Sequence, residues 1–175
     1  MLTRSEAMQT VRDAASRFIR TCDSATDDEW VGRPPAGAWS IGDIAEHVTI
    51  ANANILRRLQ SLDQHPLDGR PVAVEDAEMP YLFYRGDEPP SVATPTGAMH
   101  KDRTAFRAFQ DSIDGVERWL AANTLDLRTV GTAHPVFGLL DGVQWLLFCG
   151  AHIERHRAQI IGQLRSAAGD GLDTI

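Results

Sequence analysis

The chain is short of cysteine, of basic residues and of long apolar runs, and each shortage excludes a class of protein. Its 175 residues include two cysteines, Cys22 and Cys149, which are too few for a disulfide framework and lack zinc-finger spacing. The 17 Lys and Arg residues face 24 Asp and Glu residues, and the net charge of −7 argues against a nucleic-acid partner. No run of about 18 apolar residues occurs, so no membrane partner is expected.

The amino-terminal residues also lack the charged, apolar and small-residue sections of a signal peptide. We therefore expect a cytoplasmic protein whose two cysteines are free thiols. Hydrophobic residues make up 43% of the chain and charged residues 23%, which is ordinary for a soluble globular protein. The length suits one domain, which we expect to span residues 1–175.

Apolar residues recur every three or four positions in four stretches, which predicts four amphipathic helices. We expect these helices over about 3–22, 40–62, 96–122 and 141–167. No stretch shows a convincing strand pattern, so the predicted fold class is all-α, a four-helix bundle. A short link joins the first two helices and a long link joins the next two, which favours an up-down-down-up path.

Three of the predicted helices have recognisable start signals. Thr3 and Glu6 form a capping box, in which a hydroxyl and a carboxylate bind each other's backbone N–H. Ser40 is the expected N-cap of the second helix, with Asp43 at the third helical position, where a carboxylate favours the positive helix end. Asp141 precedes the last helix, and its expected partner is Gln144, a variant of the same box.

The link between the second and third helices, residues 63–95, is rich in proline and glycine, which forbids a long helix or a central strand. A connection of this length is commonly functional when it is ordered, and we expect an ordered one. Within it, the aromatic cluster of residues 79–84 either covers the mouth of a site or plugs one end of the bundle. The shorter stretch that follows Cys22 reads as a polar run and an ordered loop.

The last predicted helix carries His152 and His156, whose spacing of four places both imidazoles on the same helical face. Two such nitrogens can bind one divalent ion. A solvated pair of histidines on the outer face is the alternative interpretation. We favour the metal site because both histidines share a helical stripe with Trp145 and Cys149, and buried imidazoles without a ligand are costly to ionise and to satisfy.

His47 lies at the margin of the apolar stripe of the second helix. A lone histidine in such a place is usually a hydrogen-bonded structural residue, yet it is also the third nitrogen that a metal site would need. His65 and His100 are expected to be exposed, and His134 to be structural or to line a rim. Cys149 is interpreted as a small buried residue, with a position close to the metal as the alternative.

Three motifs along the chain resemble the DinB-like superfamily, which includes metal-dependent enzymes and thiol transferases. The first is Trp-Ser-Ile-Gly-Asp-Ile-Ala-Glu-His-Val at residues 39–48, and the second is His-Pro-Val-Phe-Gly-Leu-Leu at residues 134–140. The third joins Gln-Trp-Leu-Leu-Phe at residues 144–148 to His-x-x-Arg-His-Arg-x-Gln-Ile at residues 152–160. Each motif is weak alone, but the three together, in this order and spacing, are fairly specific.

The resemblance implies that His47, His152 and His156 hold a divalent metal ion, most often zinc or nickel, inside the bundle. It also implies a homodimer, because members of the family are frequently homodimers. It implies a small-molecule substrate, because relatives transfer low-molecular-weight thiols such as bacillithiol or mycothiol to electrophiles. Metal-dependent hydrolysis, or metal or small-molecule binding without turnover in a stress response, are the alternatives. No catalytic residue beyond the metal ligands is predicted; Glu46 and Glu154 point away from the ligands, so each is a surface residue or supports a ligand indirectly.

Overall fold

The structure is a computed structural model that describes residues 1–34, 38–84, 93–100, 103 and 106–167, with side chains described at all of these except 82–84 and 100. The described chain is mostly helical, which confirms the all-α expectation apart from one small two-stranded sheet. None of the described helices is long and apolar enough to cross a membrane.

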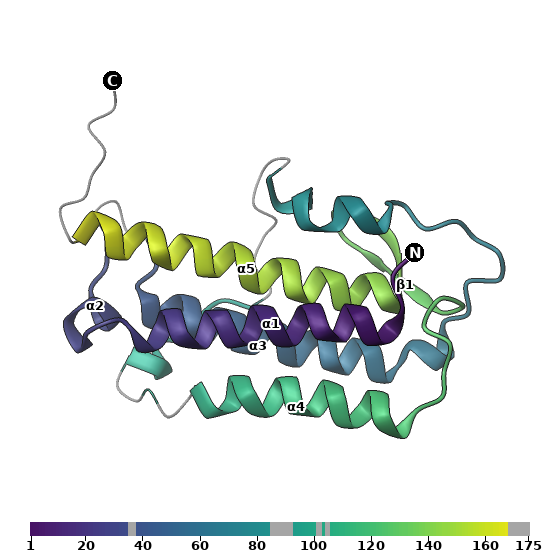
Figure 1. The fold of residues 1–175 in the computed structure, drawn as a ribbon, viewed down its shortest axis with the longest axis horizontal. Coiled ribbons are helices and arrows are strands. Elements are labelled where there is room, and N and C mark those ends of the chain that lie inside the picture. The colour runs from purple at the N-terminus through teal and green to yellow at the C-terminus, as the bar shows by residue number, and fades with distance from the viewer. Residues whose placement is uncertain (35–37, 85–92, 101–102, 104–105, 168–175) are drawn as a thin grey trace.

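Four long helices lie side by side (Figure 1). They are α1 (Arg4–Asp23), α3 (Ile41–Gln60), α4 (Phe106–Ala122) and α5 (Gly142–Ala167). In Figure 1, α1 and α5 run from right to left, whereas α3 and α4 run from left to right. Helix α5 packs against both α1 and α3, and α4 packs against α3 and α1. The hydrophobic core lies between these four helices.

The predicted start signals are confirmed at all three helices. Thr3 and Glu6 form the capping box of α1, and Ser40 and Asp43 form that of α3. At α5 the Gln144 backbone N–H donates to Asp141 Oδ1 at 2.8 Å, and the Gln144 side-chain oxygen accepts from the Asp141 N–H at 3.2 Å. These reciprocal bonds satisfy backbone donors that a helix end leaves without intrahelical partners.

Two helix predictions were wrong. The third helix was expected from about residue 96, but α4 spans Phe106–Ala122, and residues 98–100 form the short 3-10 helix η4 (Ala98–His100). The physical reason is a turn: Gly97 has φ of +82°, and the N–H groups of Thr96 and Gly97 donate to the carboxylate of Glu46. The second error was the short helix α2 (Asp27–Val31), which was read as a polar run and a loop although Thr26 and Glu29 form a capping box.

The connection after α3 contains two more 3-10 helices, η2 (Leu62–Gln64) and η3 (Asp76–Tyr84). η3 packs against α5, and its Met79 is fully buried, whereas Tyr81 is exposed. The side chains of residues 82–84 and all of 85–92 lie outside the described residues, so the choice between a cover over a site and a plug at one end of the bundle stays open for residues 79–84. The expectation that no long helix forms in the described part of this connection is confirmed.

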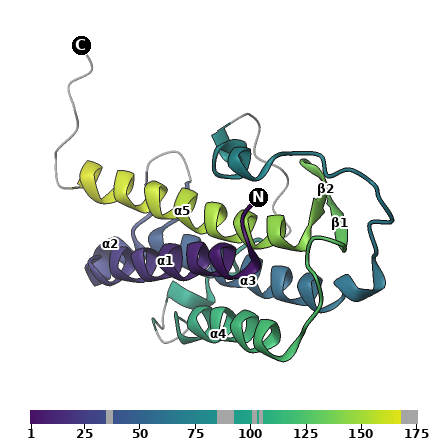
Figure 2. The ribbon, with the colours of Figure 1, turned by 45° about the vertical axis from the view of Figure 1, so that its right-hand side comes forward.

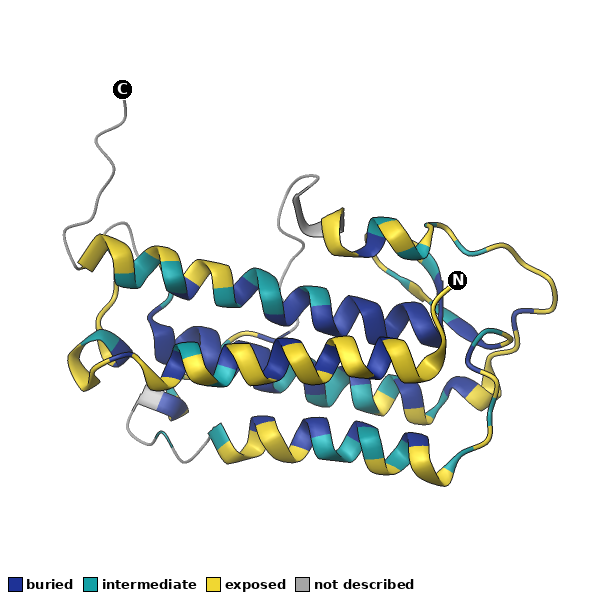
Figure 3. Ribbon diagram, viewed as in Figure 1, coloured by how far each residue is buried: buried dark blue, intermediate teal, exposed yellow. Residues whose placement is uncertain are grey.

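The small sheet is a hairpin of β1 (Gly131–His134) and β2 (Gly138–Asp141), antiparallel, with Thr132 opposite Leu140. Figure 2 shows the hairpin at one end of the bundle, beside the start of α5. Together with η3, α1 and α3, it encloses that end of the helix, and residues 142–150 are buried on every side (Figure 3).

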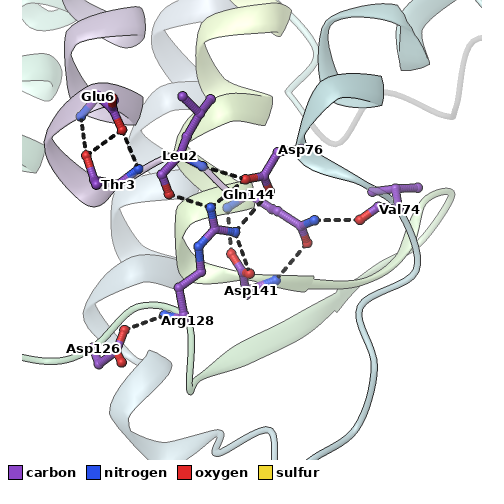
Figure 4. A network of polar contacts seen from close by, with 9 residues as sticks. All are labelled: Leu2, Thr3, Glu6, Val74, Asp76, Asp126, Arg128, Asp141 and Gln144. Carbon is purple, nitrogen blue, oxygen red and sulfur yellow. Dashed lines mark hydrogen bonds and ion pairs between the residues drawn. The ribbon is translucent and has the colours of Figure 1, made fainter.

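Arg128 joins the hairpin, the long connection and the chain start in one polar network (Figure 4). Its guanidinium donates to Asp141 Oδ2 at 2.8 Å and to Asp76 Oδ2 at 2.6 Å, and also to the carbonyl of Leu2 at 2.6 Å. Asp141 therefore both caps α5 and pairs with Arg128. The Gln144 side chain extends the network by donating to the Val74 carbonyl at 2.6 Å.

Replacing Asp141 with alanine should lower the free energy of unfolding by about 2–3 kcal/mol, because the helix cap and a half-buried charge pair are lost together. Asp126→Ala is the matched control, since this exposed carboxylate accepts from the Arg128 backbone N–H across a turn and its loss should cost less than about 1 kcal/mol. Urea unfolding at neutral pH measures both; equal losses would contradict the role given to Asp141.

Candidate metal centre

The structure brings His47 of α3 together with His152 and His156 of α5. The ring nitrogens lie at 3.1 Å between His47 Nε2 and His152 Nε2 and at 3.2 Å between His156 Nε2 and His152 Nε2. One possible ligand atom from each ring lies within 4.8 Å of the others, and all three residues are buried. The three histidines named from the sequence therefore form one cluster that could hold a metal ion.

Two of the rings are oriented by hydrogen bonds at their other nitrogen. His47 Nδ1 lies 2.8 Å from the Ala93 carbonyl oxygen, and His156 Nδ1 lies 2.9 Å from Gln159 Oε1. Because each oxygen can only accept, both rings carry their hydrogen on Nδ1. In the neutral rings Nε2 then presents a lone pair to the cluster, which is the orientation that a metal ligand needs.

Hydrogen bonds among the three Nε2 atoms cannot satisfy all three of these nitrogens at once. A hydrogen on His152 Nε2 can serve one neighbour well, but the lone pairs of His47 and His156 both face it. A divalent cation would accept all three lone pairs. Zinc bonds of about 2.0–2.1 Å in tetrahedral geometry place ligand nitrogens about 3.3 Å apart. The separations of 3.1 Å and 3.2 Å from His152 Nε2 to the other two rings are close to this value. The donor set therefore fits a metal ion.

Burial keeps the imidazoles of α5 neutral. It lowers the pKa of His152 well below its usual range, and the nearby His156 and His47 lower it further. Burial also lowers the pKa of His156 to about 4, again with a contribution from His47. Neutral imidazole is the form that binds metal, so at neutral pH few protons compete for these nitrogens.

Aromatic rings contact two of the three histidines. The ring of Trp39 packs on His47 with centroids 4.8 Å apart, and the carbonyl of Trp39 accepts from the Gln163 side chain of α5 at 2.9 Å. On α5 the ring of Phe148 stacks on His152 at 6.0 Å. These apolar neighbours reduce the local dielectric and strengthen electrostatic interactions inside the site.

The other residues considered from the sequence lie apart from the cluster or line its surroundings. Cys149 is a buried residue, as predicted, and its thiol donates to Asn52 Oδ1 at 3.3 Å. His134 is half-buried on the hairpin, where its Nδ1 accepts from the N–H of Val136 and its ring stacks on Phe137. His65 is exposed, as expected, whereas the side chain of His100 lies outside the described residues.

Sequence reasoning missed the Ala93 carbonyl, because a backbone oxygen carries no residue-type signal. It also left Glu46 open between two interpretations. Glu46 is buried and binds the backbone of residues 96–99, so the surface interpretation was wrong. Glu154 pairs with Arg17 and Arg157 on the outer side of α5, in agreement with the surface interpretation.

Comparison with known proteins adds a family assignment. The family model described as the DinB superfamily matches residues 10–160 of the chain. This region extends from within α1 to within α5 and contains all three histidines of the cluster. No curated protein matches the chain.

The metal-free protein should lose stability as the pH falls from about 6.5 to about 4. Burial places the pKa of His156 at about 4 in the folded state, against its ordinary value of 6.5 in the unfolded chain. Between these values the unfolded state binds more protons, so the free energy of unfolding decreases on acidification. His156 alone should contribute a loss of roughly 3 kcal/mol at pH 4.

Urea unfolding in the presence of a chelator measures this loss. The interval from pH 5 to 6.5 is the most informative, because carboxylates with ordinary or lowered pKa values hardly titrate there. His156→Gln should reduce the slope of unfolding free energy against pH in this interval. An unchanged slope would show that His156 is not held neutral by burial.

Proposed function

Since the chain belongs to the DinB superfamily, we propose that it binds a divalent metal ion, zinc or nickel, through His47, His152 and His156. We further propose that it is a metal-dependent enzyme that transfers a low-molecular-weight thiol to an electrophilic small molecule. The observation that carries the proposal is the convergence of three buried Nε2 atoms from two separate helices.

Three protein nitrogens leave further coordination positions for a small molecule, which is typical of a catalytic rather than a structural site. A divalent ion bound there would lower the pKa of a coordinated thiol or water and so supply a nucleophile at neutral pH. The chain's own residues orient the imidazoles, keep them neutral and surround them with apolar rings. In the transfer, a bond forms between the thiol sulfur and the electrophilic carbon as the thiol proton and the leaving group depart.

The state of the chain's own cysteines supports an external thiol. Cys149 is completely enclosed, and burial raises the pKa of its thiol to about 12. Burial also raises the pKa of Cys22, which lies in the core at the end of α1. Neither residue is available as a thiolate at neutral pH, so the sulfur that reacts would come from a substrate.

Hydrolysis is the second candidate, because the same open positions would accept water as readily as a thiol. The two reactions differ in their requirement for a thiol, which makes them separable by experiment. Binding of a metal or small molecule without turnover is the third possibility, and it predicts no product with or without a thiol.

We also propose the four-helix bundle with an up-down-down-up path as the description of the scaffold. The directions of α1, α3, α4 and α5 in Figure 1 and the packing of α5 between α1 and α3 support it. A cytoplasmic homodimer is proposed from the family resemblance and from the composition of the chain.

Alanine at position 47, 152 or 156 should remove the bound metal. Each substitution deletes one of three nitrogen ligands, and the metal affinity should fall by more than about 100-fold. Elemental analysis of freshly purified protein, followed by competition with a chromophoric chelator, measures the change. His65→Ala is the control, because His65 is exposed and should leave the metal content unchanged. Full metal content in all three variants would refute the metal centre.

The metal-loaded protein should conjugate a low-molecular-weight thiol to an electrophile, and the His152→Ala variant should not. A suitable assay combines bacillithiol, mycothiol or glutathione with a chloronitrobenzene and follows the coloured conjugate. Cys149→Ser should retain activity, because the reacting sulfur belongs to the substrate. Conjugation lost with Cys149 would contradict this scheme, turnover without any thiol would identify a hydrolase, and no product from a broad panel would favour binding alone.

A further inference from the structure

Residues 93–99 cross α3 beside the histidine cluster, and side chains from two helices hold this segment at its ends. At one end the Ala93 carbonyl accepts from His47 Nδ1 at 2.8 Å. At the other end the Met99 carbonyl accepts from the indole N–H of Trp30 at 2.9 Å, which ties the segment to α2. Ala93, Met99 and Trp30 are all buried, so both ends are fixed inside the protein.

Glu46 holds the middle of the same segment. Its Oε1 accepts from the Thr96 backbone N–H at 2.8 Å and from the Thr96 hydroxyl at 2.5 Å. Its Oε2 accepts from the N–H groups of Gly97 at 3.0 Å and Met99 at 3.4 Å. Gly97 has φ of +82°, which glycine adopts without strain, and the turn presents successive N–H groups to one carboxylate.

The carboxylate form of Glu46 suits this task. Burial of the residue opposes ionisation, but the hydrogen bonds from Thr96, Met99 and Gly97 outweigh burial and lower the pKa of Glu46. Hydrogen bonds to an ionised acceptor are about twice as strong as those between neutral groups. Four of them on one side chain form a strong clamp on a short stretch of backbone.

Glu46 and His47 are consecutive residues of α3, so their side chains leave the helix about 100° apart. His47 faces α5, where its Nε2 lies 3.1 Å from His152 Nε2, and Glu46 faces the crossing segment. Thr94 and Pro95 lie between Ala93 and Thr96. Proline fixes its own φ and restricts the backbone of the residue before it, so this short path has little conformational freedom. The segment thus connects the side chains of two neighbouring residues.

We propose that Glu46 is a positioning residue for His47: it clamps residues 96–99 on α3, holds the Ala93 carbonyl against His47 Nδ1, and so directs the His47 Nε2 lone pair into the cluster. The consequence for metal affinity rests on the proposed function, whereas the orientation of the His47 ring does not. The two parts can therefore be tested separately.

The first test uses the metal-free protein. Nitrogen NMR of the histidine rings should show His47 of the native protein with its hydrogen on Nδ1. Glu46→Gln removes the charge and replaces one accepting oxygen with an NH₂ group, so backbone N–H groups of residues 96–99 lose an acceptor. The Ala93 carbonyl should then no longer be held against His47 Nδ1, and His47 should become a mixture of both ring tautomers. Hydrogen exchange at the amides of Thr96, Gly97 and Met99 should become faster in the same variant.

The second test measures zinc affinity by chelator competition. Glu46→Gln should weaken binding by about 10–100-fold, the usual effect of losing a group that orients a ligand. Glu154→Gln is the matched control, because Glu154 lies two residues from both His152 and His156 but pairs outward with Arg17 and Arg157. Its zinc affinity should stay within about twofold of the native value.

Unchanged ring tautomer and unchanged zinc affinity in Glu46→Gln would overturn the proposal. If the native protein binds no metal, the proposed function fails, and the tautomer measurement alone decides the role of Glu46. Should Glu46→Gln fail to fold, two variants of Thr96 replace it. Thr96→Val removes the hydroxyl that donates a hydrogen bond to Glu46, and Thr96→Ser keeps it. Valine should shift the tautomer and serine should not; identical behaviour of the two would overturn the proposal.

Discussion

The central constraint on this protein is that the Nε2 lone pairs of two buried imidazoles, His47 and His156, are directed at the same atom, His152 Nε2. Hydrogen bonds at Nδ1 orient the His47 and His156 rings, so their Nε2 atoms meet His152 Nε2 at little more than 3 Å. Protonation would relieve this opposition, but burial opposes it at His152 and His156. A bound cation would accept the lone pairs and leave the rings unprotonated. The hydrogen bonds at Nδ1 and the aromatic rings beside the cluster would support such a cation.

The fold supplies the site through the pairing of α3 with α5. The two helices run in opposite directions in Figure 1. Later residues of α3 therefore contact earlier residues of α5: His47 contacts His152, Asn52 contacts Cys149, and Arg58 lies over the ring of Trp145. These contacts together define how the two helices are aligned. The start of α5, which is buried and capped by Asp141, supports this alignment at one end.

Much of this was predictable from the sequence, for reasons that differ between parts. Helix starts at Thr3, Ser40 and Asp141 follow from local capping chemistry, and the cluster of His47, His152 and His156 follows from helical spacing together with family motifs. The start of α4 and the contact between Glu46 and residues 96–99 were not predictable, because they depend on which distant backbone reaches a side chain. A carbonyl such as that of Ala93 is invisible in a one-letter sequence.

The burial of both cysteine thiols would protect the protein from alkylation by the electrophiles of the proposed reaction. A protein that handles electrophiles risks alkylation at any accessible sulfur, and this chain keeps Cys22 and Cys149 within its core as weakly acidic thiols. If the proposed reaction with electrophiles is correct, alkylation of these two thiols would require the bundle to open transiently, so resistance to reactive compounds would depend on the stability of the fold.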